Sequence, residues 1–164
     1  TIIEIIKNKM NKNYQIIWAT GPKQYDEVKE NLEKNNININ NIKDIKIIPY
    51  IYNMEEIMNC VDVIVARSGA MTITEISNLG KPSILVPLPN VSHNHQLYNA
   101  QVLEKVNAAK IILDNEIKGE NLNNTIEQIV LNKKTMDKMG QNALKVSTTN
   151  AEDKIYNEIK KIIK

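Results

Sequence analysis

Phenylalanine is absent from this chain of 164 residues, which has one tryptophan and one cysteine. With no second cysteine, the chain cannot form an internal disulfide, which fits a reducing compartment. The apolar side chains that remain are mainly Ile, Leu, Val and Met. Aliphatic side chains pack well in parallel sheets, so this bias favours an α/β protein. Cys60 lies in the apolar stretch 57–61, and we expect it to be a small buried thiol.

The chain also lacks an excess of charge of one sign. Its 21 basic and 19 acidic residues give a net charge of +2, and the signs are mixed along most of the chain. A nucleic-acid-binding protein concentrates positive charge, so this class is excluded. We interpret the basic end, Lys160, Lys161 and Lys164, as the solvated face and end of a helix, with weak attraction to anionic lipid as the alternative. Long apolar runs and a signal peptide are absent, so we expect a soluble, cytoplasmic domain.

Short apolar runs alternate with segments of helical periodicity. The apolar runs predict strands at 14–19, 45–49, 61–66, 83–87 and 109–113. Helices are predicted at 2–10, 25–35, 54–59, 70–79, 95–106, 119–132, 133–145 and 150–163. The Asn-rich stretch that follows residue 35 is expected to be a surface loop. The alternation implies right-handed βαβ units, and hence a Rossmann-like, doubly wound parallel sheet with helices on both faces.

No internal repeat or linker divides the chain, so we interpret residues 1–164 as one domain. A doubly wound domain normally begins with a strand that leads through a Gly-rich turn into its first helix. Here the helical pattern begins at once, at Ile2 and Ile3. We therefore expect a fragment whose first strand and Gly-rich loop are missing.

In such sheets, ligands bind beyond the carboxyl ends of the strands. Of the strand ends at 20–21, 49–51, 67–69 and 87–89, the third is the most informative, because it turns directly into a helix. A helix N-terminus attracts phosphate through its unpaired N–H groups and its dipole. Gly69 would let a diphosphate approach the backbone. Ser68 is expected to cap the helix or to donate to an anionic oxygen.

Glu75 lies seven residues after Ser68, close to two helical turns, so we expect both side chains to project to a similar side. A carboxylate there suits a ribose diol, which offers two hydroxyl donors. The spacing alone also fits a capped helix with a solvated glutamate.

The segment 87–100 is dense in polar side chains, and Asn94, His95, Gln96 and Asn99 open a helix within it. Amides both donate and accept, which suits the hydroxyls of a sugar. A polar loop before a capped helix is the alternative. The two histidines have no acidic or cysteine partner at ligand spacing, so they make a poor metal site.

Together these motifs are similar to those of one known family. A strand is followed by R-S-G-A and then by T-x-x-E, which ends at Glu75; a G-K-P turn with its strand and an N-H-Q-x-x-N-A segment follow in matching order. They resemble the C-terminal, donor-binding domain of the MurG family, glycosyltransferases of family 28 with the two-domain GT-B architecture. This family transfers N-acetylglucosamine from UDP-N-acetylglucosamine to lipid I. The resemblance covers essentially the whole chain, most sharply residues 49–112.

The resemblance implies a role for each matching residue. Glu75 would hold the ribose hydroxyls, and Ile51 would contact uracil mainly through its backbone. His95, Gln96 and Asn99 would bind sugar hydroxyls, although His95 stands where some relatives have glutamine. Backbone amides near the diphosphate would come from Ser68, Gly69, Ala70 and Met71, and Thr72 would be a further substrate-binding residue. Arg67 would either contact the ligand or brace the loop.

The resemblance also implies what this chain does not supply. The family's Gly-Gly-Ser loop and N-terminal domain would be missing, and with them the proposed general base and the lipid I site. We therefore expect no catalytic residue here, and a chain that binds the donor without transferring it. No Asp-x-Asp sequence is present to hold Mg²⁺, so neither a metal nor a cofactor is expected. The full-length enzyme would lie peripherally on the cytoplasmic face of the cell membrane.

Three alternatives stay open. A related domain would serve an enzyme that glycosylates diacylglycerol or another lipid, because acceptor choice resides in the missing half. A noncatalytic donor-binding subunit would work with a separate membrane-bound partner, although the start at Thr1 instead of Met argues against it. The third is an α/β domain with an unrelated ligand.

Overall fold

The structure, a computed structural model, describes residues 1–39, 42–148 and 151–163. The strands are β1 (Ile16–Ala19), β2 (Ile45–Ile48), β3 (Ile64–Ala66), β4 (Ser83–Leu85) and β5 (Ala109–Ile111). The helices are α1 (Ile2–Lys7), α2 (Pro22–Lys34), α3 (Met54–Cys60), α4 (Ala70–Asn78), α5 (His95–Lys105), α6 (Gly119–Val130), α7 (Lys133–Leu144) and α8 (Ala151–Ile162), with the short 3₁₀ helix η2 (Ser92–Asn94) before α5. All predicted elements are confirmed, with shorter ends for most. Residues 40, 41 and 150 of the predicted loop and last helix lie outside the described ranges.

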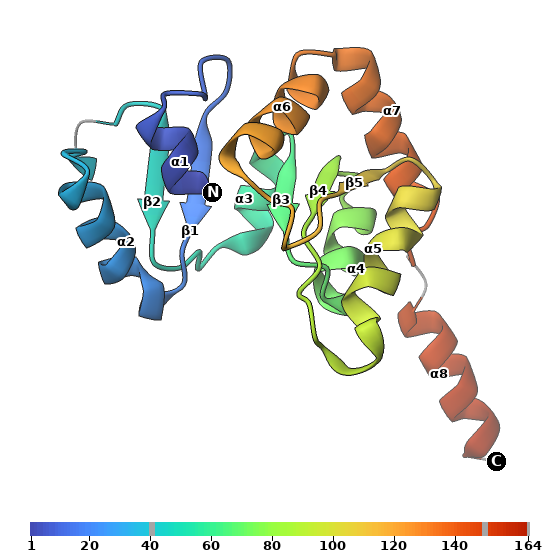
Figure 1. Cartoon of the computed structure of the whole chain (residues 1–164). Coiled ribbons are helices and arrows are strands. Elements are labelled where there is room, and N and C mark those ends of the chain that lie inside the picture. The colour runs from blue at the N-terminus through green and yellow to red at the C-terminus, as the bar shows by residue number, and fades with distance from the viewer. Residues whose placement is uncertain (40–41, 149–150, 164) are drawn as a thin grey trace.

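The strands are parallel, as predicted, but they form two sheets (Figure 1). β1 pairs with β2, and a second sheet has the order β3-β4-β5. Within the described residues, no ladder of backbone hydrogen bonds joins β1 to β3, so the single continuous sheet that we expected is not present.

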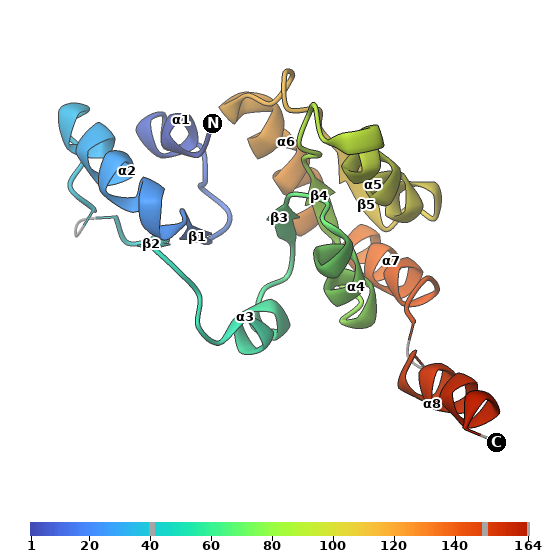
Figure 2. The ribbon, with the colours of Figure 1, turned by 90° about the horizontal axis from the view of Figure 1, so that it is seen from below.

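Helices cover both faces of the sheet β3-β4-β5, because adjacent residues of a strand point to opposite faces. Leu85 packs with Ile76 of α4 and Leu103 of α5. Its neighbour Ile84 faces the other way, into a cluster with Ile5 of α1 and residues of α6. Figure 2 shows α5 and α6 on opposite sides of this sheet. The three-layer arrangement confirms the doubly wound α/β class.

Contacts of α1 and the segment after it with α6 connect the two sheets. The Glu4 carboxylate accepts a hydrogen bond of 2.6 Å from the backbone N–H of Gly119, the first residue of α6. The Tyr14 hydroxyl donates to Oδ1 of Asn123 at 2.7 Å. Burial, and after it the charge of Glu127, raises the pKa of Tyr14 to about 12. The part of the chain that carries β1 and β2 is thus fixed to the second sheet by polar as well as apolar contacts.

Replacing Glu4 with glutamine is expected to lower the free energy of unfolding by about 1 kcal/mol, because a carboxylate at a helix N-terminus accepts a charge-assisted bond and interacts with the helix dipole. Glu120 lies in the same first turn of α6 and is exposed, so Glu120→Gln is the matched control. Urea unfolding of both variants measures the difference. Equal losses in the two variants would contradict a specific role for the bond between Glu4 and Gly119.

Cys60 is exposed, so the prediction of a buried thiol was wrong. It is the last residue of α3, whose buried side chain is Met58. Two residues correspond to about 200° around a helix, so Cys60 points away from the face that Met58 buries.

The C-terminal helix α8 extends away from the rest of the molecule (Figures 1 and 2). Lys160 and Lys161 are exposed on it, as predicted, and Lys161 pairs with Glu158 at 2.6 Å. Lys164 lies outside the described residues. Among the helices of the described ranges, none has both the length and the apolar content needed to cross a bilayer.

Candidate functional site

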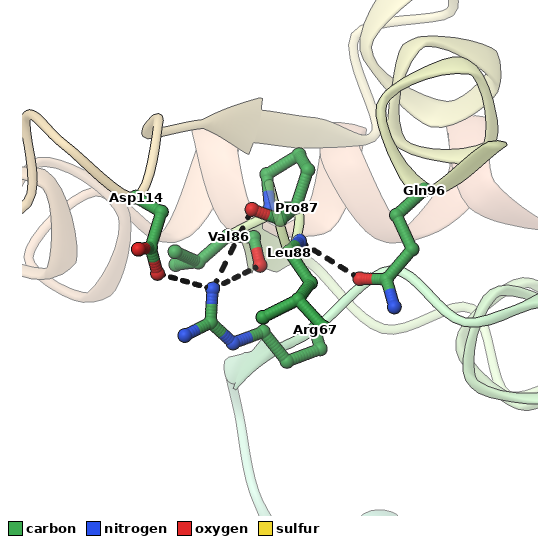
Figure 3. Close-up of polar contacts among 6 residues, drawn as sticks. All are labelled: Arg67, Val86, Pro87, Leu88, Gln96 and Asp114. Atoms are coloured by element: carbon green, nitrogen blue, oxygen red, sulfur yellow. Dashed lines mark hydrogen bonds and ion pairs between the residues drawn. The ribbon is translucent and has the colours of Figure 1, made fainter. Parts of the chain in front are cut away.

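The carboxyl ends of β3, β4 and β5 meet at one edge of the second sheet because the strands are parallel. Arg67, the first residue after β3, connects these ends (Figure 3). Its Nη1 donates to the carbonyl oxygens of Val86 at 3.2 Å and Pro87 at 3.4 Å, and to Oδ1 of Asp114 at 2.5 Å. Arg67 therefore braces the edge, which is one of the two roles that its motif implied.

Ser68 connects the same turn to α5. Its side chain is fully buried, and its Oγ donates to the carbonyl oxygen of Gln96 at 2.7 Å. In return, Nδ2 of Asn99 donates to the carbonyl oxygen of Ser68 at 3.0 Å. These bonds bring Arg67, Ser68, Gln96 and Asn99 into one cluster, although the β3–α4 turn and α5 are about 30 residues apart in the chain.

One of the two roles expected for Ser68, and the expected orientation of Glu75, were wrong. Ser68 does not cap α4: the N-cap residue is Gly69, and the helix has no side-chain cap. Glu75 is exposed whereas Ser68 is buried, so the two side chains do not project to a similar side. The reason is that Ser68 lies before the helix, where the helical spacing does not apply.

The N-terminus of α4 offers uncapped backbone donors. The N–H of Ile73 bonds to the carbonyl oxygen of Gly69 at 3.0 Å. The N–H groups of Ala70, Met71 and Thr72 come before this first bond and, in an α-helix, have no partner within the helix itself. They carry the positive end of the helix dipole. This turn is therefore suited to an anion.

Gly69 is not required by the fold. Its φ of −63° and ψ of 151° are open to any residue. A Cβ atom at this position would meet only Oγ1 of Thr72, at 3.9 Å, which is ordinary van der Waals contact. The protein itself would accept a side chain here.

The loop before α5 has an unusual backbone. Asn90, His93 and Asn94 have φ values of 59°, 54° and 51°. These lie in the left-handed backbone region, which residues other than Gly, Asn and Asp rarely adopt. Ser92 holds this loop: its hydroxyl lies 2.8 Å from Nδ1 of His93, and its carbonyl oxygen lies 2.9 Å from Nδ1 of His95. The bond from the His95 ring fixes its orientation at the start of α5.

Gln96 connects α5 to the end of β4. Its Oε1 accepts a hydrogen bond from the N–H of Leu88 at 2.9 Å, and Figure 3 shows its amide nitrogen on the side away from Leu88. The amide nitrogen is therefore directed away from the bond that holds the side chain.

Ile51 lies in the segment after β2, a strand of the other sheet, and it is half-buried. Its neighbours Tyr50 and Tyr52 form an edge-to-face pair with ring centroids 5.1 Å apart, and their side chains are 54% and 92% exposed. The residues predicted from the motifs thus come from the carboxyl ends of strands in both sheets.

Asp114 was missed by the sequence analysis, which considered the ends of the first four strands only. It lies three residues after the last strand. The same rule on strand ends, applied to β5, would have found it.

The chain matches the model of the glycosyltransferase family 28 C-terminal domain over residues 1–158. It is 41% identical over 162 residues to the UDP-N-acetylglucosamine–N-acetylmuramyl-(pentapeptide) pyrophosphoryl-undecaprenol N-acetylglucosamine transferase of Thermoanaerobacter sp. (strain X514), covering 99% of this chain and 44% of the relative. The protein of the same name from Lactobacillus johnsonii is 40% identical over 153 residues, covering 93% of this chain and 40% of that protein. The chain thus spans less than half the length of these relatives.

Solved structures of glycosyltransferases also resemble this chain. The crystal structure of Acinetobacter baumannii MurG superposes with a TM-score of 0.81 and 25% identity, covering 98% of this chain and 44% of that one. The glycosyltransferase VinC, solved in complex with dTDP, gives a TM-score of 0.68 at 12% identity over 88% of this chain and 33% of VinC, which shows a shared fold. The chain belongs to glycosyltransferase family 28, as a C-terminal domain of the MurG type.

Proposed function

We propose that this chain is the UDP-N-acetylglucosamine-binding domain of an inverting N-acetylglucosaminyltransferase that converts lipid I to lipid II in peptidoglycan synthesis. The names of the relatives from Thermoanaerobacter and Lactobacillus support this donor and this acceptor. The observation that carries the proposal is the turn at Gly69, where uncapped helix donors coincide with a glycine that the fold does not need.

The diphosphate would bind at the N-terminus of α4. The N–H groups of Ala70, Met71 and Thr72 point outward along the helix axis, and the absence of a side chain at Gly69 leaves room for phosphate oxygens. The guanidinium of Arg67 adds positive charge one residue before Ser68. When UDP departs, negative charge grows on the β-phosphate, and fixed donors at this position would stabilise it.

The uridine would lie between α4 and the segment after β2. Glu75 is exposed, one turn into α4 from the proposed diphosphate site, so its carboxylate is free to accept bonds from the two ribose hydroxyls. Ile51 would contact the base through its backbone, as the resemblance implies.

The sugar would bind at the start of α5, through atoms that the resting hydrogen bonds leave available. Gln96 would use its amide nitrogen, because its Oε1 accepts from Leu88. Asn99 would use its Oδ1, because its Nδ2 donates to Ser68. His95 would use Nε2, because its Nδ1 faces the carbonyl oxygen of Ser92 and is therefore assigned the proton.

In the whole enzyme, an acceptor hydroxyl would attack the anomeric carbon of the sugar. The new bond joins this carbon to the acceptor oxygen, the bond to the β-phosphate oxygen breaks, and the hydroxyl proton passes to a general base. We place that base in the part of the enzyme that this chain does not span. The chain alone is therefore proposed to bind the donor without transferring the sugar, and conversion of lipid I by the purified chain would contradict this.

Gly69→Ala tests the proposal. We expect affinity for UDP to fall at least about tenfold, because the new methyl group displaces phosphate oxygens from one or more helix donors. The free energy of unfolding should stay unchanged or rise slightly, because alanine restricts the unfolded chain. Isothermal titration and thermal unfolding measure the two effects. Unchanged UDP affinity in a folded variant would exclude the α4 N-terminus as the diphosphate site.

A further inference from the structure

We propose that Asp114 is a positioning residue for the donor site, which acts by holding the guanidinium of Arg67. This inference rests on the proposed function, since it concerns the same nucleotide site. Asp114 belongs to none of the motifs that carry the resemblance, and it does not lie in the β3–α4 turn or at the start of α5.

The contacts of one nitrogen atom carry the argument. Nη1 of Arg67 has two N–H groups and three acceptors: the carbonyl oxygens of Val86 and Pro87, and Oδ1 of Asp114. The bond to Asp114 joins opposite charges, whereas the other two acceptors are neutral backbone carbonyl groups at 3.2 and 3.4 Å. Asp114 therefore contributes the strongest of the bonds that hold this nitrogen.

Holding Nη1 also orients the rest of the guanidinium, because the group is planar and rigid. Figure 3 shows Nη2 and Nε directed away from the carbonyl groups of Val86 and Pro87, which follow β4. Among the three nitrogen atoms of the Arg67 guanidinium, only Nη1 forms a hydrogen bond within the described part of the chain. The remaining N–H groups are thus presented in a fixed plane beside the β3–α4 turn, where we place the diphosphate.

The turn is fixed from both sides. Ser68 and Asn99 hold it to α5, and Arg67 holds it to the ends of β4 and β5. Without Asp114, the two weaker carbonyl bonds would hold Arg67 alone, and the long side chain would sample other rotamers. A donor would then have to order Arg67 on binding, which weakens affinity.

Simple electrostatics predicts the opposite result. Asp114 carries a negative charge close to a site for an anion, so its removal should strengthen the binding of UDP. A purely structural role would lower the stability of the protein instead of its affinity for UDP. We expect little loss of stability, because the pair is partly exposed, with side chains 49% and 34% accessible, and exposed ion pairs add little stability. The sign of the change in affinity therefore separates positioning from electrostatics.

Asp114→Asn is the test, with UDP and UDP-N-acetylglucosamine titrated into the 164-residue chain. We expect affinity for both to fall about tenfold, while the melting temperature changes by no more than about 2 °C. Unchanged or tighter binding would overturn the inference. So would a variant that does not fold, because Asp114 would then serve the fold.

A double-mutant cycle tests whether Asp114 acts through Arg67. In the Arg67→Ala background, Asp114→Asn should cause no further loss, whereas independent effects that add would contradict the inference. Asp114→Glu should recover most of the affinity, and Glu116→Gln, which removes an exposed charge two residues later, should have no effect. A wild-type chain that fails to bind UDP would contradict the proposed function itself; loss in the Asp114 variant alone, without coupling to Arg67, would contradict only this inference.

Discussion

Replacing Glu75 with alanine is expected to weaken the binding of UDP-N-acetylglucosamine at least about 100-fold. A hydrogen bond to a charged group contributes about 1.5–3 kcal/mol, and two such bonds to the ribose would be lost. The side chain is exposed in the unliganded structure, so its removal costs the fold little. Isothermal titration measures the affinity, and thermal unfolding checks that the variant is intact.

The control for charge is Glu104→Ala, which removes an exposed glutamate near the opposite end of α5 from Gln96. Its affinity should match that of the wild type. The control for the ribose contact is 2′-deoxy-UDP. The wild type should bind UDP more tightly than the deoxy analogue, and Glu75→Ala should lose most of this discrimination. A variant that still discriminates as strongly as the wild type would place the ribose contact elsewhere.

Replacing Gly140 with alanine is expected to lower the free energy of unfolding by about 2 kcal/mol, through overpacking between two backbones. A Cβ atom at this position would lie 2.5 Å from the carbonyl oxygen of Gly80, closer than real Cβ atoms approach. Because that neighbour is backbone, no side chain can move aside, and α7 must shift away from the end of α4.

The other side of this contact is equally constrained. Gly80 has a φ of 61°, and its N–H bonds to the carbonyl oxygen of Ser77 while the N–H of Lys81 bonds to that of Ile76. This is the Schellman arrangement at the end of α4, which needs the left-handed residue. The carbonyl of Gly80 is therefore held where it meets Gly140.

The sign of this effect is informative because helix propensity opposes it. Alanine inside a helix is favoured over glycine by about 1 kcal/mol, so propensity alone predicts that Gly140→Ala stabilises the protein. We expect a fall in melting temperature of about 4–8 °C. Gly69→Ala is the matched control, with the same substitution and no expected loss. An increase in melting temperature for Gly140→Ala would contradict the close packing of α4 on α7.

The order and type of the elements could be predicted from the sequence because each has a clear period. Short aliphatic runs such as 83–87 have the length of buried strands, and the segment 119–132 has the spacing of an amphipathic helix. The separation of the strands into two sheets could not be predicted, because strand pairing depends on tertiary contacts. The orientation of Cys60 depended on which face of the short helix α3 packs inward, which composition does not determine.

The motif residues of the site could be found from sequence, but their contacts could not. Ser68 and Glu75 have fixed separations in the chain, yet Ser68 lies outside the helix and points into α5 instead. Arg67 was left with two possible roles because Asp114, the partner that shows it bracing the strand ends, lies 47 residues later. Such a pair is brought together only when β3 and β5 flank β4.

Titration of UDP-N-acetylglucosamine into this chain tests the central claim most directly. We expect saturable binding that is weaker for UDP-glucose, because the start of α5 would contact the acetamido sugar, and much weaker for the Glu75→Ala variant. A demonstrably folded chain that shows saturable binding of neither UDP-N-acetylglucosamine nor UDP would contradict the account of the donor site.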